Sequence, residues 1–397
     1  MSGCILSVRN LHVVFTLRGR KLHALRGVDL DVEDGESLAI VGESGSGKSV
    51  LNRNFIGLLD QNGIISEGQI RYYGMGDKLR HYPGAGSDEN GDYIDLAVLK
   101  KKEDWLRIRG SEICMIPQDP MTSLNPLKSI GWQISEALML HRGMKGKMAY
   151  EETIRILEDV RIDQPRKRYK QYPHELSGGM RQRVVIAIAM ACQPRILICD
   201  EPTTALDVTI QAQVLRLLRE LKEKYHLTII FITHDLGVVA NIADRVAVMY
   251  AGEIVEIGLA DEIFYDPRHP YTWALLSSLP QLGHRGEDLY AIRGTPPNLF
   301  LEVHGDAFAP RNPQSLVIDS LQAPPMFEIS PTHRAKTWLL DGRAPKLSPP
   351  EAVRKVRELG KPAEKGAEAG APEADMKRME AGASGTGLKG GAADGEP

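Results

Sequence analysis

Gly42-Glu43-Ser44-Gly45-Ser46-Gly47-Lys48-Ser49 is the most informative stretch of this 397-residue chain. It follows an apolar segment, residues 38–41, that is predicted to be a strand, and it runs into a predicted helix. Glycines let the backbone bend until its N–H groups face one point, and the start of the helix adds positive potential for phosphate. In such a GxxxxGK[ST] loop, Lys48 would reach the β- and γ-phosphates of a nucleotide, and the Ser49 hydroxyl would hold Mg²⁺. The alternative, a glycine-rich turn that only joins strand to helix, does not account for the Lys-Ser pair in this setting.

Two adjacent acids end another predicted strand. Residues 196–199 are apolar, and Asp200 and Glu201 follow them directly. Carboxylates at the end of a buried strand are costly unless something compensates their charge. Asp200 is suited to orient Mg²⁺ through a water molecule, and Glu201 is suited to polarise an attacking water as general base. An ordinary capped strand end would look the same in isolation, but beside the phosphate-binding loop the pair predicts nucleotide hydrolysis.

Short apolar segments alternate with segments of helical periodicity. This order is typical of an α/β protein with a mostly parallel sheet that is covered by helices on both faces. Two alternating strands at residues 6–15 and 22–32 come first, and residues 76–95, rich in Gly, Asp and Asn, are predicted to be a surface loop or insertion. The remaining predicted strands are 37–41, 113–116, 196–199, 228–233 and 245–250, and the predicted helices are 130–162 (with a break near 143–147), 177–191, 209–224 and 236–243.

Composition narrows the class of protein. The net charge is −3, with 49 basic and 52 acidic residues, so no global field favours nucleic acid or anionic lipid. The four cysteines show no CxxC spacing, which predicts reduced thiols of a cytosolic protein. The sequence shows neither a signal peptide nor an apolar run near the ~20 residues of a membrane span. We therefore expect a soluble protein that contacts a membrane only through partners.

The sequence changes character after about residue 266. Residues 266–345 are rich in proline and carry scattered aromatic residues, which predicts a small appended domain. Residues 346–397 contain no Phe, Tyr, Trp or Ile, and this composition is typical of a disordered tail. One short helix is possible within the tail, at residues 351–359, because Ser348 and the two prolines after it can start a helix.

The string Leu176-Ser177-Gly178-Gly179-Met180 is the most discriminating motif. Ser177 can cap a helix whose first turn is glycine, which leaves backbone donors open to an anion. Here the chain resembles the ABC ATPase family, whose signature is LSGGQ; Met180 replaces the usual Gln, but the serine and glycines that contact nucleotide are kept. The resemblance implies ATP and Mg²⁺ as ligands. It also implies a P-loop NTPase (RecA-like) core with an N-terminal antiparallel β subdomain, all within residues 1–265, and a helical signature subdomain at about residues 119–176.

The resemblance assigns further residues to the ATP site. Gln118 matches the glutamine that touches Mg²⁺ and senses the γ-phosphate, Asp207 matches the D-loop aspartate, and His234 matches the switch histidine. Phe15 stands where the family places an aromatic residue that stacks on adenine. Gln118 and His234 also have a plainer interpretation, as ordinary polar residues at the end of a strand, and Phe15 could be part of the core.

The family binds each nucleotide between two subunits, the phosphate-binding loop of one and the signature of another. Lys48, Gln118, Glu201 and His234 of this chain would therefore serve its own ATP. Ser177, Gly178 and Gly179 would serve the ATP of the other subunit. Because only one set of motifs occurs here, the resemblance implies a second ATPase subunit, identical or related.

Longer strings are similar to the oligopeptide/dipeptide importer subfamily. They include 116–126 (IPQDPMTSLNP), 171–191, 200–213 and 231–240, and in the C-terminal block 267–272 (PRHPYT), 294–297 (GTPP) and 337–340 (TWLL). Residues 266–345 are thus identified as an oligopeptide-transporter-type domain. The implied role is a translocase ATPase that powers peptide uptake as a peripheral subunit on the cytoplasmic face of the cell membrane. Its implied partners are a sister ATPase, two membrane permeases and an extracellular peptide-binding protein.

Other functions remain open to different degrees. The same ATPase subunit could serve an importer for nickel or an oligosaccharide, because other subunits select the transported solute. A non-transport ABC ATPase is disfavoured, since the chain has neither a second cassette nor a coiled-coil or zinc insertion. An inactive paralogue is disfavoured because Lys48, Asp200, Glu201 and His234 are all present.

Many members of the subfamily hold an iron–sulfur cluster with four C-terminal cysteines. The matching positions here are Asp306, Asn312, Asp319 and Thr337, and none of them is a thiolate. Ligation of such a cluster needs thiolates in nearly all cases. We therefore expect no cluster in this chain.

Overall fold

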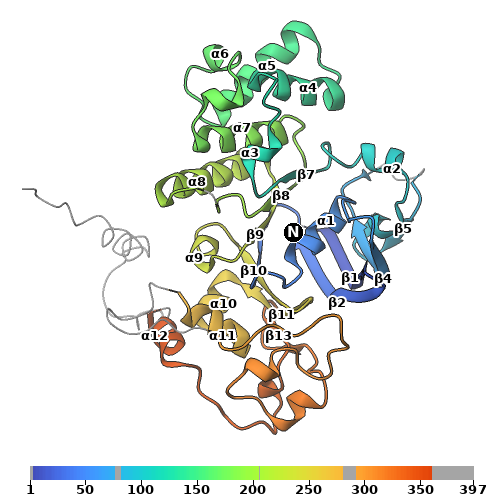
Figure 1. The fold of residues 1–397 in the computed structure, drawn as a ribbon, viewed down its shortest axis with the longest axis vertical. Coiled ribbons are helices and arrows are strands. Elements are labelled where there is room, and N and C mark those ends of the chain that lie inside the picture. Colours follow the sequence, from blue (N-terminus) through green and yellow to red (C-terminus); the bar gives the residue numbers. More distant parts are fainter. Residues whose placement is uncertain (1–2, 77–81, 205, 280–291, 360–397) are drawn as a thin grey trace, which may run out of the picture. The chain divides into compact units, whose positions relative to one another are not determined.

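Two β-sheets organise the described part of the chain, residues 3–76, 82–204, 206–279 and 292–359 of the computed structural model (Figure 1). The first sheet is antiparallel, with the strand order β2-β1-β4-β6-β5. Its strands are β1 (Cys4–Leu17), β2 (Arg20–Glu33), β4 (Gly63–Tyr72), β5 (Ala85–Asp88) and β6 (Gly91–Asp95). The predicted antiparallel β subdomain is therefore confirmed.

The hairpin β5–β6 lies inside residues 76–95, which the sequence predicts to be a surface loop or insertion. The loop alternative is wrong for residues 85–95, while residues 77–81 lie outside the described part. Ile94 is fully buried, and Asp95 Oδ1 accepts a 3.0 Å hydrogen bond from the backbone of Ile70 in β4. The polar composition instead serves the turn, where Asp88 Oδ1 accepts a 2.9 Å hydrogen bond from the Asn90 N–H.

The second sheet has the strand order β12-β13-β11-β10-β3-β9-β8-β7. Five of its strands are parallel, and β11, β13 and β12 are added antiparallel at one end. Every residue of β3, β8 and β9 is buried, as expected where helices cover both faces. The bounds are β3 Ser37–Val41, β7 Ile113–Ile116, β8 Ile196–Asp200, β9 Thr228–Thr233, β10 Arg245–Tyr250, β11 Glu253–Leu259, β12 Phe327–Glu328 and β13 Arg334–Ala335.

The order β3-β9-β8-β7 brings together segments that are far apart in the sequence. Neighbouring parallel strands end at the same edge of a sheet, and ligands of such sheets bind at that edge. β3 leads into the glycine-rich loop 42–49, and β7 leads to Gln118. β8 ends at Asp200, and β9 leads to His234. The predicted mostly parallel core is confirmed, and it gathers the candidate residues at one edge.

Helices on the two faces of this sheet belong to different hydrophobic cores. In β8, Ile196 and Ile198 face the core that contains α1 and the antiparallel sheet, whereas Leu197 and Cys199 face the core that contains α4, α5, α7 and α8. Figure 1 shows α4, α5, α6 and α7 gathered together. The bounds are α1 Lys48–Phe55, α2 Lys102–Leu106, α3 Pro120–Ser123, α4 Ile130–Arg142, α5 Gly146–Asp159, α6 Pro165–Arg168, α7 Gly178–Met190, α8 Val208–Tyr225 and α9 Leu236–Val239.

One predicted helix has the break that the sequence predicts, and another is shorter than predicted. Gly143 ends α4 in a left-handed conformation (φ 63°), which confirms the predicted break in 130–162. The helix predicted at 236–243 is regular only over α9, residues 236–239, and continues as turns to Ile242.

The C-terminal segment, residues 260–279 and 292–359 of the described part, packs on the end of the second sheet. It pairs with that sheet directly, because β13 pairs with β11. Its aromatic residues form the adjoining core, where Tyr250, Tyr271 and Phe308 meet with ring centroids 4.5–5.3 Å apart. The segment contains α10 (Ala260–Tyr265), α11 (Pro270–Ser277), α12 (Glu351–Leu359) and the 3₁₀ turns Ala309–Arg311, Val317–Ser320 and Trp338–Leu340.

The first part of the predicted tail is folded. The helix anticipated at residues 351–359 forms α12, and Val353 and Val356 on it are 1% and 7% exposed. α12 packs against α10 and α11. Residues up to 359 belong to one compact unit, and residues 360–397 lie outside the described part.

Two further observations concern the chemistry of the whole chain. Within the described ranges, the structure has no helix with both the length and the apolar character needed to cross a membrane. All four cysteines are free, as predicted, and burial raises the pKa of each thiol. Such thiols are poorly reactive.

Candidate functional site

The glycine-rich loop is pressed against neighbouring backbone. Gly42 has φ 152°, and a Cβ atom there would lie 2.1 Å from the carbonyl oxygen of Met249. Gly47 has φ 105°, and its Cβ would lie 2.9 Å from the carbonyl oxygen of Ala24. Only glycine tolerates both the dihedral angles and the close approach. The sequence pattern therefore has a steric cause, and the loop is held between β2 and β10.

Lys48 opens α1 and turns back into the loop. Its Nζ donates hydrogen bonds to the carbonyl oxygens of Gly42 (2.7 Å) and Glu43 (2.8 Å), and more distantly to Ser46 Oγ (3.4 Å). Burial lowers the pKa of Lys48, and the charges of Glu201, Asp200 and Glu43 oppose that change only in part. The loop thus holds a cation at its centre, close to the acids at the end of β8.

Ser49 and Asp200, both predicted to hold Mg²⁺, lie together. Ser49 Oγ donates a 3.3 Å hydrogen bond to Asp200 Oδ1. Burial raises the pKa of Asp200, although the Ser49 hydrogen bond counteracts it. A hydroxyl and a carboxylate suit Mg²⁺, which prefers oxygen ligands. Among the described residues no group of three or more His, Cys, Asp or Glu side chains could hold a metal ion, so Mg²⁺ at this pair would take its other ligands from water and phosphate.

Glu201 is the meeting point of three loops. Its Oε2 accepts hydrogen bonds from Gln118 Nε2 (2.9 Å) and Thr204 Oγ1 (3.1 Å), and its Oε1 lies 3.1 Å from His234 Nδ1. Burial raises the pKa of Glu201, but hydrogen bonding and charge from His234, then Thr204 and Lys48, outweigh it and hold the pKa below its usual value. The carboxylate is therefore kept ionised beside the lysine. Thr204 was not identified from the sequence, where it is one of two threonines in DEPTTA.

The signature, residues 176–180, lies at the start of α7, on the core that contains α4, α5, α7 and α8. Ser177 Oγ caps α7 by accepting a 3.4 Å hydrogen bond from the Met180 N–H. Ser177 and Gly178 are exposed, whereas Met180 is partly buried and packs in the core around α7 and α8. Packing thus accounts for an apolar residue at this position of the motif. Asp207 Oδ1 caps α8 by accepting a 3.0 Å hydrogen bond from the Ile210 N–H.

Phe15 is buried in the core of the antiparallel sheet. The residue is only 8% exposed and lies opposite Leu22 and Gly63 on the neighbouring strands. A ring buried in this way offers little of its face to a ligand. Stacking of Phe15 on adenine stays a prediction.

The sequence did not reveal two residues that contact the loop from the C-terminal segment. The Tyr271 hydroxyl accepts a 2.7 Å hydrogen bond from the Glu43 N–H, and the Arg311 guanidinium forms an ion pair with the Glu43 carboxylate. Tyr271 belongs to the string PRHPYT, whose only signal in the sequence is its similarity to the importer subfamily. For Arg311, the sole hint in the sequence is an arginine between Ala307-Phe308-Ala309-Pro310 and Asn312-Pro313.

Comparison with known proteins agrees with this geometry. Residues 25–204 match the family described as ABC transporter, and residues 255–317 match the C-terminal region of oligopeptide/dipeptide transporters. The chain is 54% identical over 349 residues to the oligopeptide transport ATP-binding protein AmiE of Streptococcus pneumoniae, covering 88% of this chain and 93% of that protein. It is 52% identical over 364 residues to OppD of Bacillus subtilis (91% and 96% covered) and 51% identical over 350 residues to the dipeptide transport protein DppD of Lactococcus lactis (88% and 95% covered).

Solved structures share the cassette. The dimeric ATP-binding cassette MJ0796, in a post-hydrolysis state bound to ADP and Pi, matches with TM-score 0.53 and 26% identity over 64% of this chain and 98% of that chain. The fold and the site thus define an ABC transporter ATPase. Within that class, the chain belongs to the family of oligopeptide/dipeptide transport ATP-binding proteins, which confirms the resemblance drawn from the sequence.

Proposed function

We propose that this chain binds and hydrolyses ATP to power the uptake of oligopeptides or dipeptides by an ABC importer. The observation that carries the proposal is the convergence of Lys48, Asp200, Glu201, Gln118 and His234 at the carboxyl edge of four neighbouring parallel strands. Phosphoryl transfer to water depends on positioning and on charge stabilisation, and these residue types supply both.

The roles follow from the contacts. Lys48, held in the loop, would turn to the β- and γ-phosphates, and Ser49 with Asp200 would hold Mg²⁺, which supplies charge stabilisation when bound. Glu201, kept ionised, would orient the attacking water and draw its proton. Gln118 and His234, both hydrogen-bonded to Glu201, would fix the direction of that carboxylate and report on the γ-phosphate.

The ATP site would be completed by a second ATPase subunit. Ser177 and Gly178 are exposed at the start of α7, whose core is on the opposite face of the sheet from α1. Backbone N–H groups at the exposed start of a helix favour an anion. These donors would serve the nucleotide of the other subunit, with Gly179 and Asp207 beside them. The dimeric cassette among the solved neighbours supports this arrangement.

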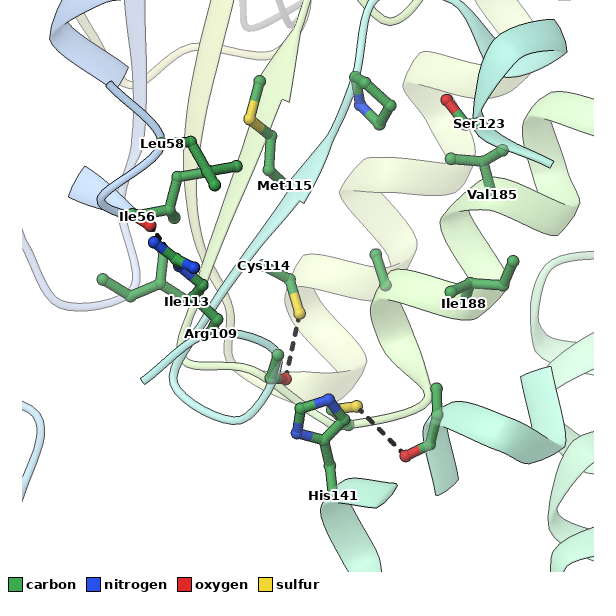
Figure 2. A pocket seen from close by; sticks show the side chains of 15 residues that line it. Ile56, Leu58, Arg109, Ile113, Cys114, Met115, Ser123, His141, Val185 and Ile188 are labelled. Atoms are coloured by element: carbon green, nitrogen blue, oxygen red, sulfur yellow. Dashed lines mark hydrogen bonds between the residues drawn. The ribbon is translucent and has the colours of Figure 1, made fainter. Parts of the chain in front are cut away.

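A pocket of about 350 Å³ beside the Gln118 loop would be the contact site for a permease. Figure 2 shows its lining, with Ile56 and Leu58 on one side, Met115 of β7, and Val185 and Ile188 of α7 on the other. A wall of this composition suits the apolar face of a short permease helix. The two permeases would thereby place this chain on the cytoplasmic face of the membrane, with an extracellular binding protein presenting the peptide. An importer for another solute would use the same kind of ATPase subunit.

The four positions that matched cluster cysteines form local hydrogen bonds instead. Asp306, Asn312 and Thr337 each accept one from the backbone N–H two residues ahead, and Asp319 accepts one from the Leu316 N–H. These bonds, and the absence of thiolates, support the proposal that no iron–sulfur cluster is bound. Protein purified without oxygen should be colourless, and brown protein with stoichiometric iron and sulfide would contradict the proposal.

The domain division also remains a proposal: an ABC domain at 1–265 with a helical part at about 119–176, a C-terminal domain at 266–345, and a tail from 346 whose first part, α12, packs against α10 and α11. Its support is the change of composition near residue 266 and the separate family match at 255–317.

The function is tested in two steps. Lys48→Ala should weaken ATP binding to the purified chain, and unchanged affinity would count against the loop assignment. The chain co-expressed with its permeases and binding protein in membrane vesicles should then drive ATP-dependent uptake of a labelled oligopeptide. Uptake of nickel or an oligosaccharide, without peptide uptake, would instead identify the other solute class.

A further inference from the structure

The C-terminal segment binds Glu43, the second residue of the phosphate loop, through an ion pair and a hydrogen bond. Arg311, in the 3₁₀ turn Ala309–Arg311, forms a two-pronged ion pair with it, with Nη1 2.6 Å from Oε2 and Nη2 3.0 Å from Oε1. The Arg311 side chain is 5% exposed and that of Glu43 is 26% exposed. Pairs of this geometry fix direction as well as distance, and solvent screens this one little.

All five N–H donors of Arg311 have a partner. Besides the two bonds to Glu43, Nε donates to the carbonyl oxygen of Arg293 (2.9 Å), Nη1 to the Tyr250 hydroxyl (3.2 Å), and Nη2 to the carbonyl oxygen of Ile292 (3.4 Å). The hydrogen bonds that Arg311 donates to Glu43 raise the pKa of the guanidinium above its ordinary value. A guanidinium satisfied in every direction has one position, so it holds Glu43 in one position too.

Tyr271 holds the same residue by its backbone. Its hydroxyl accepts a 2.7 Å hydrogen bond from the Glu43 N–H, and the ring is fully buried against Tyr250 and Phe308. The start of α11 fixes the ring, because His269 Nδ1 accepts a 3.0 Å hydrogen bond from the Tyr271 N–H. The PRHPYT string therefore has a defined task, which is to present this hydroxyl to the loop.

Glu43 passes the constraint to the lysine. Its carbonyl oxygen accepts the 2.8 Å hydrogen bond from Lys48 Nζ, while its N–H and its side chain are bound by Tyr271 and Arg311. Every polar group of Glu43 thus links the C-terminal segment to the cation that would meet the phosphates. The two partners are distant in sequence, 228 and 268 residues from Glu43.

We propose that the C-terminal segment positions the phosphate loop for ATP, with Arg311 and Tyr271 as positioning residues that act through Glu43. The inference rests on the proposed function, in which this loop binds ATP. It implies that the affinity for ATP depends on a segment outside residues 25–204, which match the ABC transporter family. A conformational change in the C-terminal segment would then alter the phosphate loop of the ATP site.

The test compares ATP affinity, turnover and thermal stability in the full-length chain. Arg311→Met removes the ion pair and keeps an unbranched apolar side chain, and we expect the Kd for ATP to rise about tenfold, or about 1.4 kcal/mol. Arg311→Lys, which offers a point charge in place of a fork, should recover part of the loss. Tyr271→Phe removes only a hydroxyl from a ring that stays packed, so it carries the same test if Arg311→Met does not fold.

A matched control separates positioning from general stability. Lys336→Met breaks the 2.7 Å ion pair of Lys336 with Glu253, which ties the same segment to β11 without contacting the phosphate loop. We expect its Kd for ATP to equal that of the unmodified chain. If Arg311→Met and Lys336→Met weaken ATP binding equally, or if Arg311→Met and Tyr271→Phe both bind ATP as the unmodified chain does, the inference is overturned.

Two further variants test whether Arg311 acts through Glu43 and whether the phosphate loop binds ATP. Glu43→Gln should weaken ATP binding as Arg311→Met does, and the double variant should be no weaker than either single one; additive losses would contradict a shared route through Glu43. Lys48→Ala tests the proposed function itself. If Lys48→Ala binds ATP normally, the proposed function fails, whereas loss there with normal binding in the Arg311 and Tyr271 variants defeats only the inference.

Discussion

His234 Nδ1 lies 3.1 Å from Glu201 Oε1, although the two residues follow different strands, β9 and β8. These strands are parallel neighbours, so their carboxyl ends bring the imidazole and the carboxylate to the same edge of the sheet. On the other side of the carboxylate, Gln118 occupies Oε2. Glu201 is thereby aimed by residues from two flanking strands, which is the arrangement that a general base requires.

Glu201→Gln should leave ATP binding intact and slow turnover by about 10²–10⁴-fold, the usual size of a general-base contribution. The amide keeps the shape of the side chain but cannot accept the proton of water. Equilibrium binding of ATP and single-turnover hydrolysis would measure the two effects separately. Glu220→Gln, an exposed carboxylate on α8 that pairs with Arg161, is the control and should behave as the unmodified chain. Near-normal turnover in Glu201→Gln would remove Glu201 from its role.

His234→Ala should change the pH dependence of hydrolysis as well as its rate. Burial raises the pKa of Glu201, and His234 is the main group that lowers it below the usual value. Without the imidazole the pKa rises, so a higher pH is needed to ionise the base and the acid limb of the kcat profile moves upward. The acid limb of Gln118→Ala should move less than that of His234→Ala, because Gln118 is a neutral donor to the carboxylate and His234 is the main group that lowers this pKa. An acid limb that does not move in His234→Ala contradicts the pairing.

Gly42→Ala should abolish ATP binding and destabilise the fold. The added Cβ would lie 2.1 Å from the Met249 carbonyl oxygen, in a backbone region that alanine rarely adopts, so the loop must leave β10. We expect a loss of more than about 1 kcal/mol in the free energy of unfolding. Gly342→Ala is the control, because a Cβ there would have no atom within 4 Å. Equal melting temperatures for the two variants would show that the contact does not constrain the loop.

Asp306→Asn should stabilise the protein at neutral pH. Burial raises the pKa of Asp306 from 3.8 to about 6, so the folded form retains a proton between these values that the unfolded form has lost. The free energy of unfolding therefore falls as the pH rises from about 4 to about 6. Asparagine removes this loss, at most about 3 kcal/mol, and can still accept the Phe308 N–H.

Thermal unfolding at pH 5 and pH 8 measures the Asp306 effect. The gain from Asp306→Asn should be larger at pH 8 and should shrink toward pH 5. Asp60→Asn, at a carboxylate that is 62% exposed, should show no such difference. A gain that is independent of pH would mean that ionisation of Asp306 is not its cause.

Val353→Asp should destabilise the protein even though Val353 lies within the predicted tail. Its side chain is 1% exposed and packs in the core with α10 and α11, so a charge there would be buried without a partner. We expect a loss of about 2–4 kcal/mol, comparable with other disrupted core positions. A chain that ends after Leu359 should retain the stability of the full chain, whereas one that ends after Leu347 should not. Equal stability of the two truncated chains would show that α12 is dispensable.

Several parts of the fold were predictable because they depend on local pattern. Buried parallel strands are continuous apolar runs, so residues 37–41, 113–116, 228–233 and 245–250 were predicted with the bounds that the structure shows. The hairpin β5–β6 and the two-residue strands β12 and β13 were not predicted. Their composition is polar or irregular, and they are strands only because an existing sheet edge pairs with them.

The chemical groups of the site could be predicted from motifs for a similar reason. A phosphate loop needs glycine where the backbone must bend or pass close to its neighbours, and it needs a lysine and a hydroxyl beside them, so Gly42–Ser49 could be recognised in isolation. Asp200 and Glu201 were recognised because paired acids rarely end a buried strand without a partner. Each of these constraints acts over a few residues, and a linear pattern records it.

The pairing of distant groups came from the tertiary structure. That Glu201 binds Gln118 and His234 follows from the order of strands β7, β8 and β9, which no spacing in the sequence expresses. That Arg311 and Tyr271 hold Glu43 follows from the packing of the C-terminal segment against β10 and β11. Side chains more than 200 residues apart meet only when burial of the intervening core makes their approach favourable, so the identity of the groups is local information and their partnership is not.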